Sequence, residues 1–191
     1  MSVCCIGGIG LKENEIGDVF LRDVYRPYYQ DVYQYCLYLT NNKEEALDLT
    51  QDTFLKAMKN IGHYQGRSNL RTWIMSIARN TTIDSFRKKK FQRLLPMKWG
   101  KEQTFVAESP EHSVGNKAEW QILQEALTTL KDDYRQVIIL RALKEFSPKE
   151  VSEILGWSES KVRVTYHRAI QQLRKKVGKD EEGVLTYERT K

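Results

Sequence analysis

The chain has 191 residues, of which 40% are hydrophobic and 29% are charged. That length and composition are enough for one or two compact domains with cores of their own, and they exclude a chain that is disordered throughout. Lysine and arginine outnumber aspartate and glutamate by 31 to 25, which gives a net charge of +6 and favours a polyanionic partner.

The cysteines and histidines, three of each, are too few and too scattered for a zinc site or a framework of disulfides. We therefore expect no metal and no cofactor. No run approaches the roughly 18 apolar residues of a membrane span, and the opening MSVCCIGGIG lacks the basic start of a signal peptide. The sequence predicts a cytoplasmic protein.

Apolar residues recur at helical spacing through most of the chain, and strand-like alternation is almost absent. The sequence predicts an all-α protein: two small helical domains joined by a flexible linker, the C-terminal one a helix-turn-helix. Residues 1–13 are expected to be a disordered extension. The first domain is predicted at residues 14–90, with helices over 15–25, 27–39, 43–60 and 70–90. The glycine-containing stretch IGHYQGRSN is expected to be a loop.

Periodicity fades between Phe91 and Ser113, where Pro96, Gly100 and Pro110 interrupt it. Residues 91–113 are therefore predicted to form the linker. The second domain is predicted at residues 114–178, with helices over 115–130, 132–143, 148–155 and 159–177. Residues 179–191 are expected to be a polar tail.

The stretch SPKEVSEILGWSESKV carries the start and stop signals of two short-linked helices. Ser147 and Glu150 have the spacing of a capping box, and Pro148 stands at the first helical position. Gly156 suits a left-handed turn, and Ser158 suits the cap of the next helix. This order predicts a helix-turn-helix.

The second of these helices has a core-facing stripe and a cationic side. Its expected inward residues are Val162, Tyr166, Ala169, Ile170, Leu173 and Val177. Its expected outward residues are Lys161, Arg163, Val164, Thr165, His167, Arg168, Gln171 and Arg174. A helix fits the DNA major groove, where arginine bonds guanine and a small apolar group meets a thymine methyl. The alternative is a solvated charged face that binds nothing.

The helix over 70–90 and the loop before it form a second candidate DNA surface. The helix offers Arg71, Asn80, Arg87 and Lys88 away from an inward stripe of Trp73, Ile74, Ile77, Ala78 and Phe86. The loop offers Tyr64, Arg67, Ser68 and Asn69, a mixture suited to unstacked bases of a single strand. Tyr64 and Trp73 are alternatively core aromatics, and Asp84 is interpreted as an ion-pair partner.

The helix over 43–60 is different in character. Its buried stripe is predicted to be Leu47, Thr50, Phe54, Ala57 and Ile61. Asp48, Gln51, Asp52 and Leu55 then form an acidic face with an apolar centre. Such a face repels DNA and suits a basic protein partner, unless it is an ordinary exposed surface.

Taken together, these motifs resemble the extracytoplasmic-function group of bacterial sigma factors, the initiation subunits of RNA polymerase. ALDLTQDTFLKAMKNI is similar to the polymerase-docking helix of that group, and RTWIMSIARNTTIDSFRKKK to its −10 reading helix. SPKEVSEILGWSESKVRVTYHRAIQQLRKKV is similar to its −35 reading helix-turn-helix. The resemblance covers about Ile16 to Val177.

The resemblance implies a sigma factor that binds core RNA polymerase, recognises −10 and −35 promoter DNA elements and helps melt the −10 region. It places Asp48, Gln51, Asp52 and Leu55 on the β′ clamp helices, with further contact to the β subunit. The implied −10 contacts are Tyr64, Arg67, Ser68, Asn69, Arg71, Asn80, Arg87 and Lys88. The implied −35 contacts are Lys161, Arg163, Val164, Thr165, His167 and Arg168.

Short members of this group are commonly silenced by a membrane-anchored anti-sigma factor, so the resemblance implies one as a partner, and no small-molecule substrate. An ordinary repressor that uses only the helix-turn-helix is a second hypothesis, but it leaves IARNTTIDSFRKKK without a role. An enzyme is not predicted, because the chain lacks a glycine-rich phosphate loop, a nucleophile arrangement and paired carboxylates in an apolar setting.

Overall fold

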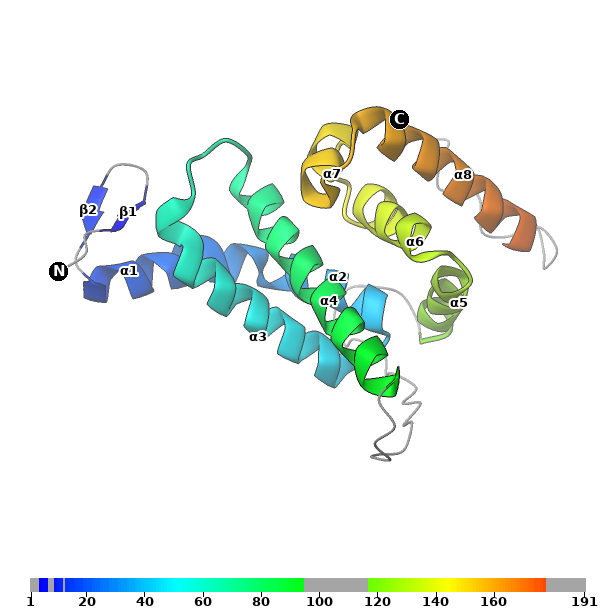
Figure 1. Ribbon diagram of the computed structural model, residues 1–191, viewed down its shortest axis with the longest axis horizontal. Coiled ribbons are helices and arrows are strands. Elements are labelled where there is room, and N and C mark those ends of the chain that lie inside the picture. Colours follow the sequence, from blue (N-terminus) through cyan, green and yellow to red (C-terminus); the bar gives the residue numbers. More distant parts are fainter. Residues whose placement is uncertain (1–3, 7–8, 12, 95–116, 178–191) are drawn as a thin grey trace. The chain divides into compact units, whose positions relative to one another are not determined.

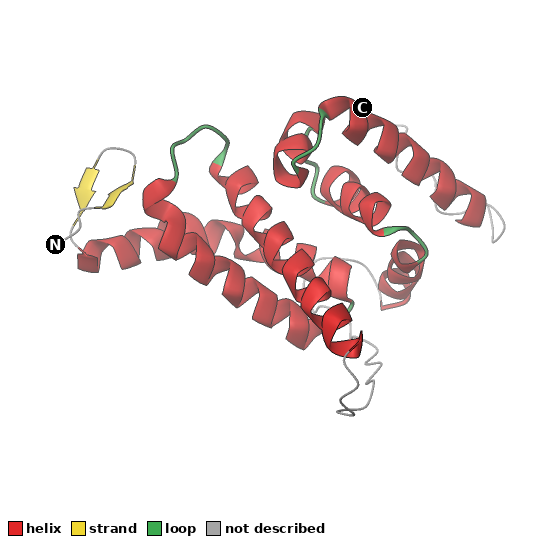
Figure 2. Ribbon diagram, viewed as in Figure 1, coloured by secondary structure: helices red, strands yellow, loops and turns green. Residues whose placement is uncertain are grey.

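The computed structural model of the protein describes residues 4–6, 9–11, 13–94 and 117–177 (Figure 1). Most of the chain up to Ala107 forms one compact unit, and most of the remainder forms another. Nearly all of the described residues are helical (Figure 2), so the predicted all-α class is confirmed.

The first unit is a short hairpin followed by a group of helices. Its elements are β1 (Cys4–Ile6), β2 (Ile9–Leu11), α1 (Glu13–Phe20), a π-helical segment (Leu21–Tyr25), α2 (Arg26–Thr40), α3 (Lys43–Asn60), a 3₁₀ turn (Ile61–His63) and α4 (Leu70–Leu94). α2, α3 and α4 pack against one another (Figure 1). Their contact encloses a core whose fully buried members include Val32, Tyr35, Leu37, Ala46, Ala57, Ile74 and Ala78.

The hairpin corrects the expectation that residues 1–13 are disordered. β1 and β2 pair antiparallel, with Cys4 opposite Leu11 and Ile6 opposite Ile9. The sequence did contain a signal for this pairing, because Gly-Gly between two short apolar runs is typical of a two-residue hairpin loop.

α1 and α2 join through the π-helical segment instead of a break between two helices. The Arg26 amide donates a hydrogen bond to the Leu21 carbonyl, five residues earlier, immediately before Pro27. Proline has no N–H, and in a regular helix its ring collides with the carbonyl four residues back. The wider π turn relieves that collision, so the chain stays helical where the sequence predicted an interruption.

Two asparagines form the turn between α2 and α3. Asn41 takes a left-handed φ of 50°, and its amide donates to the Leu37 carbonyl at 2.9 Å. The Asn42 side-chain oxygen accepts from the Glu45 amide at 2.9 Å. These contacts end α2 and cap α3.

Cys36 of α2 is fully buried, and its sulfur lies 3.8 Å from the Thr82 hydroxyl. Burial raises the pKa of the Cys36 thiol to about 11. Because the thiolate is the nucleophile, we expect alkylation of Cys36 at pH 8 to be roughly 100-fold slower in the folded protein than in denaturant. Mass spectrometry after timed iodoacetamide labelling measures this, and equal rates in both states would contradict the burial.

α4 continues to Leu94, so residues 91–94, predicted as linker, belong to its last turn. The sequence from Leu70 to Leu95 contains no proline or glycine, so no helix-breaking residue occurs in α4 before Pro96. The rest of the predicted linker and the predicted tail 179–191 lie outside the described residues.

The elements described from residue 117 onward are α5 (Lys117–Thr128), α6 (Asp132–Ile138), a π-helical segment (Ile139–Leu143), α7 (Pro148–Leu155) and α8 (Glu159–Val177). The second unit contains all of them except residues 152–156. α8 packs against α6 and α5. The Arg135 guanidinium donates through Nε to the Leu127 carbonyl at 3.0 Å, and through Nη2 to the carbonyls of Thr128 and Leu130. One side chain of α6 therefore satisfies the end of α5.

The predicted helix-turn-helix signals are confirmed. The Ser147 amide donates to the Glu150 carboxylate at 2.8 Å, and the Glu150 amide donates to the Ser147 hydroxyl at 3.2 Å, which is a reciprocal capping box. Gly156 has a φ of +67°, and the Ser158 hydroxyl accepts from the Lys161 amide at 3.3 Å. Both helices of the motif match the predicted bounds to the residue.

Candidate nucleic-acid interface

The outer side of α8 carries five of the six side chains predicted to read DNA at a −35 element. Lys161, Arg163, Val164, His167 and Arg168 are all exposed. On the opposite side of the helix, the buried residues include Val162 and Ala169. The predicted division of α8 into a core stripe and a cationic side is therefore present in the structure.

Thr165 is the exception, and its predicted outward position was wrong. Its exposed fraction is only 9%. It follows Val162 by three residues and precedes Ala169 by four, and that spacing places all three on one helix face. Its polar side chain suggested a surface residue, but helix geometry puts it beside the core, away from the cationic side of α8.

Two exposed cations of α8 have partners one turn away. Lys161 Nζ lies 3.7 Å from the centroid of the Trp157 ring, and Arg163 Nη2 lies 3.2 Å from the Glu159 carboxylate. Exposed pairs of this kind stabilise a helix by only a few tenths of a kcal/mol. Their main effect is to orient the two cations.

α4 presents a second set of predicted DNA contacts. Asn80, Arg87 and Lys88 are exposed. Arg87 lies 3.9 Å from Asp84, and both side chains are largely in solvent. This distance agrees with the interpretation of Asp84 as an ion-pair partner.

Arg71, at the start of α4, has a different environment from the other predicted contacts. Its Nε lies 2.7 Å from Oδ2 of Asp31 in α2, and the two side chains are 32% and 22% exposed. Partial burial makes this pair stronger than a fully solvated one. Arg71 therefore anchors the beginning of α4 to α2, a role that sequence analysis missed because Asp31 is forty residues away in the chain.

Tyr64 holds the predicted base-binding loop in place through contacts within the loop and with α4. Its hydroxyl donates to the Ser68 carbonyl at 2.6 Å, and its ring packs on Trp73 with centroids 5.2 Å apart. Partial burial raises the pKa of the Tyr64 phenol. Neither ring is fully buried. The pair is therefore neither a fully exposed surface on which bases could stack nor a fully buried part of the core, which were the two predicted alternatives.

The two ends of this loop are fixed, and its tip faces solvent. The Asn69 side-chain oxygen accepts from the Arg71 amide at 3.0 Å, which caps α4. Gly66 has a φ of +68°, a conformation that favours glycine. Gln65 and Arg67 on either side of it are exposed. Among the predicted loop contacts, Arg67 is the one placed at the tip.

We expect Tyr64→Phe to lower the free energy of unfolding by about 1 kcal/mol, because it removes the hydrogen bond to Ser68 and keeps the ring. Urea unfolding measures the loss, and hydrogen exchange should show faster exchange in the loop. Tyr33→Phe is the matched control, since that half-buried ring stacks on Tyr29. An equal loss in both variants would contradict the closing role of Tyr64.

The outer face of α3 is acidic with an apolar line, as predicted, but the sequence misplaced one of its leucines. Asp48, Gln51, Asp52 and Leu55 are exposed. Leu47, predicted to be buried, is 40% exposed, while Leu49 takes its place in the core. Met58 is 46% exposed and was missed. We define the outer face of α3 as Leu47, Asp48, Gln51, Asp52, Leu55 and Met58.

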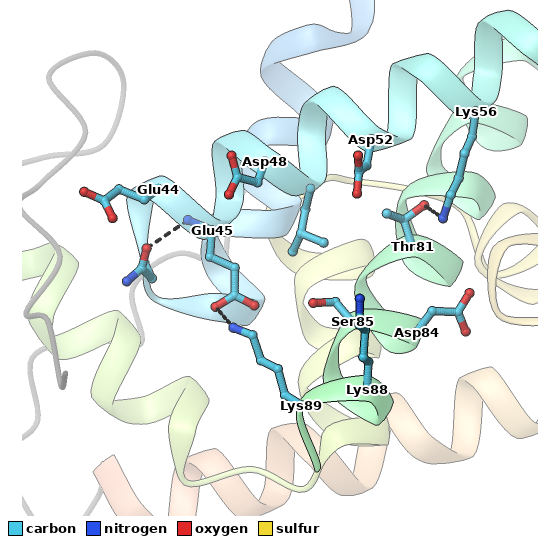
Figure 3. Close-up of a pocket in the computed structure, with 12 residues that line it drawn as sticks. Glu44, Glu45, Asp48, Asp52, Lys56, Thr81, Asp84, Ser85, Lys88 and Lys89 are labelled. Carbon is cyan, nitrogen blue, oxygen red and sulfur yellow. Dashed lines mark hydrogen bonds and ion pairs between the residues drawn. The ribbon is translucent and has the colours of Figure 1, made fainter. Parts of the chain in front are cut away.

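A cleft of about 590 Å³ runs between α3 and α4 (Figure 3). It is lined by Asn42, Glu44, Glu45, Asp48, Leu49, Asp52, Lys56, Thr81, Asp84, Ser85, Lys88 and Lys89. Lys89 Nζ lies 2.6 Å from Glu45, and Lys56 Nζ donates to Thr81 at 3.1 Å. Two acids of the outer face of α3 and the predicted DNA contact Lys88 therefore border the same cleft.

Within the described ranges, no group of three or more side chains that could bind a metal occurs. No helix in the same residues is both long and apolar enough to cross a membrane.

Two segments of the chain match families of sigma-factor domains. Residues 24–92 match Sigma-70 region 2, and residues 120–173 match Sigma-70 region 4. The RNA polymerase sigma factor YlaC of Bacillus subtilis is 39% identical over 85% of this chain and 94% of its own length. The chain therefore belongs to the RNA polymerase sigma factors of the sigma-70 family.

Within that family it belongs to the extracytoplasmic-function (ECF) group, as its motifs predicted. The ECF RNA polymerase sigma factor SigX of Bacillus subtilis is 34% identical over 80% of each chain. The fold is also that of a solved sigma factor, RpoE of Bartonella quintana in complex with the anti-sigma factor NepR. That structure aligns with a TM-score of 0.69 and 23% identity, over 85% of this chain and 99% of RpoE.

Proposed function

We propose that this sigma factor binds core RNA polymerase through the outer face of α3 and directs it to promoters with two reading elements. The first unit recognises the −10 element and helps to melt it, and the second recognises the −35 element. The observation that carries the proposal is the division of exposed side chains among three helices. α4 and α8 present cations, whereas α3 presents acids around an apolar line.

The charges of these surfaces match the proposed partners. Exposed cations next to hydrogen-bonding side chains suit the phosphates and base edges of DNA. An anionic face with exposed leucine and methionine repels DNA and suits a cationic protein surface such as the β′ clamp helices. The proposal also includes contact with the β subunit of the polymerase.

The internal contacts of the candidate residues support two different roles in this proposal. The −35 element is contacted by Lys161, Arg163, Val164, His167 and Arg168. The −10 element is contacted by Arg67, Asn80, Arg87 and Lys88, while Tyr64, Ser68, Asn69 and Arg71 hold the loop and the start of α4 in place. The internal contacts of these last four residues support a positioning role for them.

Two substitutions in α8 separate base reading from phosphate binding. Arg168→Ala should lower affinity about 5- to 100-fold for promoters with the preferred base pair and much less for others, because a bidentate arginine–guanine contact discriminates by about 1–3 kcal/mol. Lys161→Ala should weaken binding to all sequences alike and reduce the salt-dependence slope by about 1. Titrations at several salt concentrations measure both effects, and identical behaviour of the two variants would contradict these assignments.

Dependence on polymerase tests the function itself. Fluorescence anisotropy with promoter fragments from mapped transcript start sites should show tight, sequence-selective binding only when core polymerase is present. Strong selective binding by the free protein would favour an ordinary repressor or activator. In that case α3 and α4 would need another explanation.

Regulation and location follow from the same proposal. The protein acts in the cytoplasm, by binding and not by catalysis, and an anti-sigma factor anchored to the membrane holds it inactive. The complex of RpoE with the anti-sigma factor NepR supports an anti-sigma factor as the partner, because RpoE has the same fold as this chain. Co-purification of the tagged chain from membrane extracts would identify the partner.

A further inference from the structure

Glu159 is an acidic side chain on the surface of α8 that is proposed to face DNA. It is the first residue of the helix, and its carboxylate lies 3.2 Å from Arg163 Nη2, one turn along. The two side chains are 44% and 67% exposed, respectively.

A carboxylate at this place works against DNA binding in general. The first residues of a recognition helix lie close to the base edges and the phosphates, and a negative charge there is repelled by the duplex. The ion pair itself stabilises the free protein little, because it is exposed. An acid near a helix N-terminus does favour the helix dipole, but Ser158 already caps this end.

The position of Glu159 instead suits it to orient one arginine side chain, that of Arg163. Arginine has five N–H donors, and Glu159 engages one nitrogen of Arg163. The remaining donors suffice for a bidentate contact to the O6 and N7 acceptors of guanine. Holding the guanidinium on the protein reduces the number of positions from which it can reach other bases or phosphates.

The carboxylate also has a base preference of its own. In the major groove it accepts hydrogen bonds from an amino group such as cytosine N4, and it is opposed by acceptor atoms. A G·C base pair offers both acceptors for Arg163 and a donor for Glu159. A base pair without that combination leaves the carboxylate desolvated and unpaired, which lowers affinity for the wrong sequence.

We propose that Glu159 is a specificity-determining residue of α8, which holds Arg163 for one guanine and penalises other base pairs at that position. This inference rests on the proposed function of α8 as the −35 reader. Glu159 is expected to lower the affinity for DNA in general and to raise the discrimination between sequences.

The test is a selection with the full-length protein and core polymerase on promoter fragments whose −35 region is randomised. Sequencing of bound and unbound DNA gives the preference at each position for the wild type and for Glu159→Gln, Arg163→Ala and the double variant. Glu125→Gln, at an exposed acid of α5, is the matched control for the loss of one charge. Circular dichroism checks that each variant is folded.

For Glu159→Gln we expect the preference for guanine at one position to fall at least about fivefold, while affinity for unrelated DNA rises about twofold. Arg163→Ala should lose most of the preference at the same position, and adding Glu159→Gln to it should lower the preference less than Glu159→Gln does alone, because Glu159 acts largely through Arg163. An unchanged preference in Glu159→Gln, or losses at different positions, would overturn the inference. A wild type without any −35 preference would instead overturn the proposed function of α8 and the inference with it.

Discussion

Replacing both Asp48 and Asp52 by lysine should reduce the affinity for core RNA polymerase by at least about 100-fold. The two acids lie on the exposed outer face of α3, and like charges brought together at an interface cost several kcal/mol. The change reverses two charges, so the lost attraction is accompanied by repulsion from a cationic partner. Biolayer interferometry with immobilised core polymerase measures the loss, and in vitro transcription from a mapped promoter should fall in parallel.

The matched control for this charge reversal is the pair Glu119→Lys and Glu125→Lys, two exposed acids of α5. It makes the same change in net charge on a different helix. Urea unfolding should show that both double variants keep their fold, because all four side chains are exposed. If the α5 variant loses polymerase binding to the same degree, the net charge and not the outer face of α3 governs docking.

Phe146→Ala should unfold the second unit and leave the first unit folded. Phe146 is fully buried in the segment that joins the π-helical segment Ile139–Leu143 to α7, and its carbonyl accepts from the Arg141 guanidinium. Truncating a buried phenylalanine costs about 3–5 kcal/mol, which is comparable to the whole stability of a small domain. We therefore expect loss of −35 selectivity while the protein still binds polymerase.

Residue-resolved hydrogen exchange distinguishes the two units in this experiment. Amides of α6 and α8 should lose protection, and those of α2 and α3 should keep it. Ile122→Ala in α5 is the control, because that side chain is 53% exposed and its removal leaves no cavity. Loss of protection throughout the chain would show that the two units unfold together.

The elements best predicted from sequence are those whose ends carry local signals. α3, α7 and α8 match the predicted bounds to the residue, and each begins next to Asn, Ser or Pro in a position that caps or starts a helix. The two π-helical segments were not predicted, because an extra residue in a helical turn leaves the pattern of apolar residues almost unchanged. The hairpin was missed because its strands are only three residues long.

The chemical character of the candidate site was predicted better than the position of each member. Charge type along α3, α4 and α8 can be read from the sequence. Thr165 could have been placed beside the core from its spacing to Val162 and Ala169, but its polar side chain suggested the surface. Whether Leu47 faces the core depends on a rotation of α3 by a fraction of a turn, which tertiary packing decides. The ion pair between Arg71 and Asp31 joins two helices, so it cannot be predicted from the local sequence of either helix.

The cleft between α3 and α4 has a consequence for how the two proposed partners influence each other. Asp48 and Asp52 from one helix and Lys88 from the other border it, so a polymerase surface and a DNA strand that engage them come within reach of each other's charges. Such linkage is reciprocal: the factor by which polymerase tightens DNA binding equals the factor by which DNA tightens polymerase binding. We therefore expect substitutions on the two helices to have non-additive effects, and related proteins to vary these positions together.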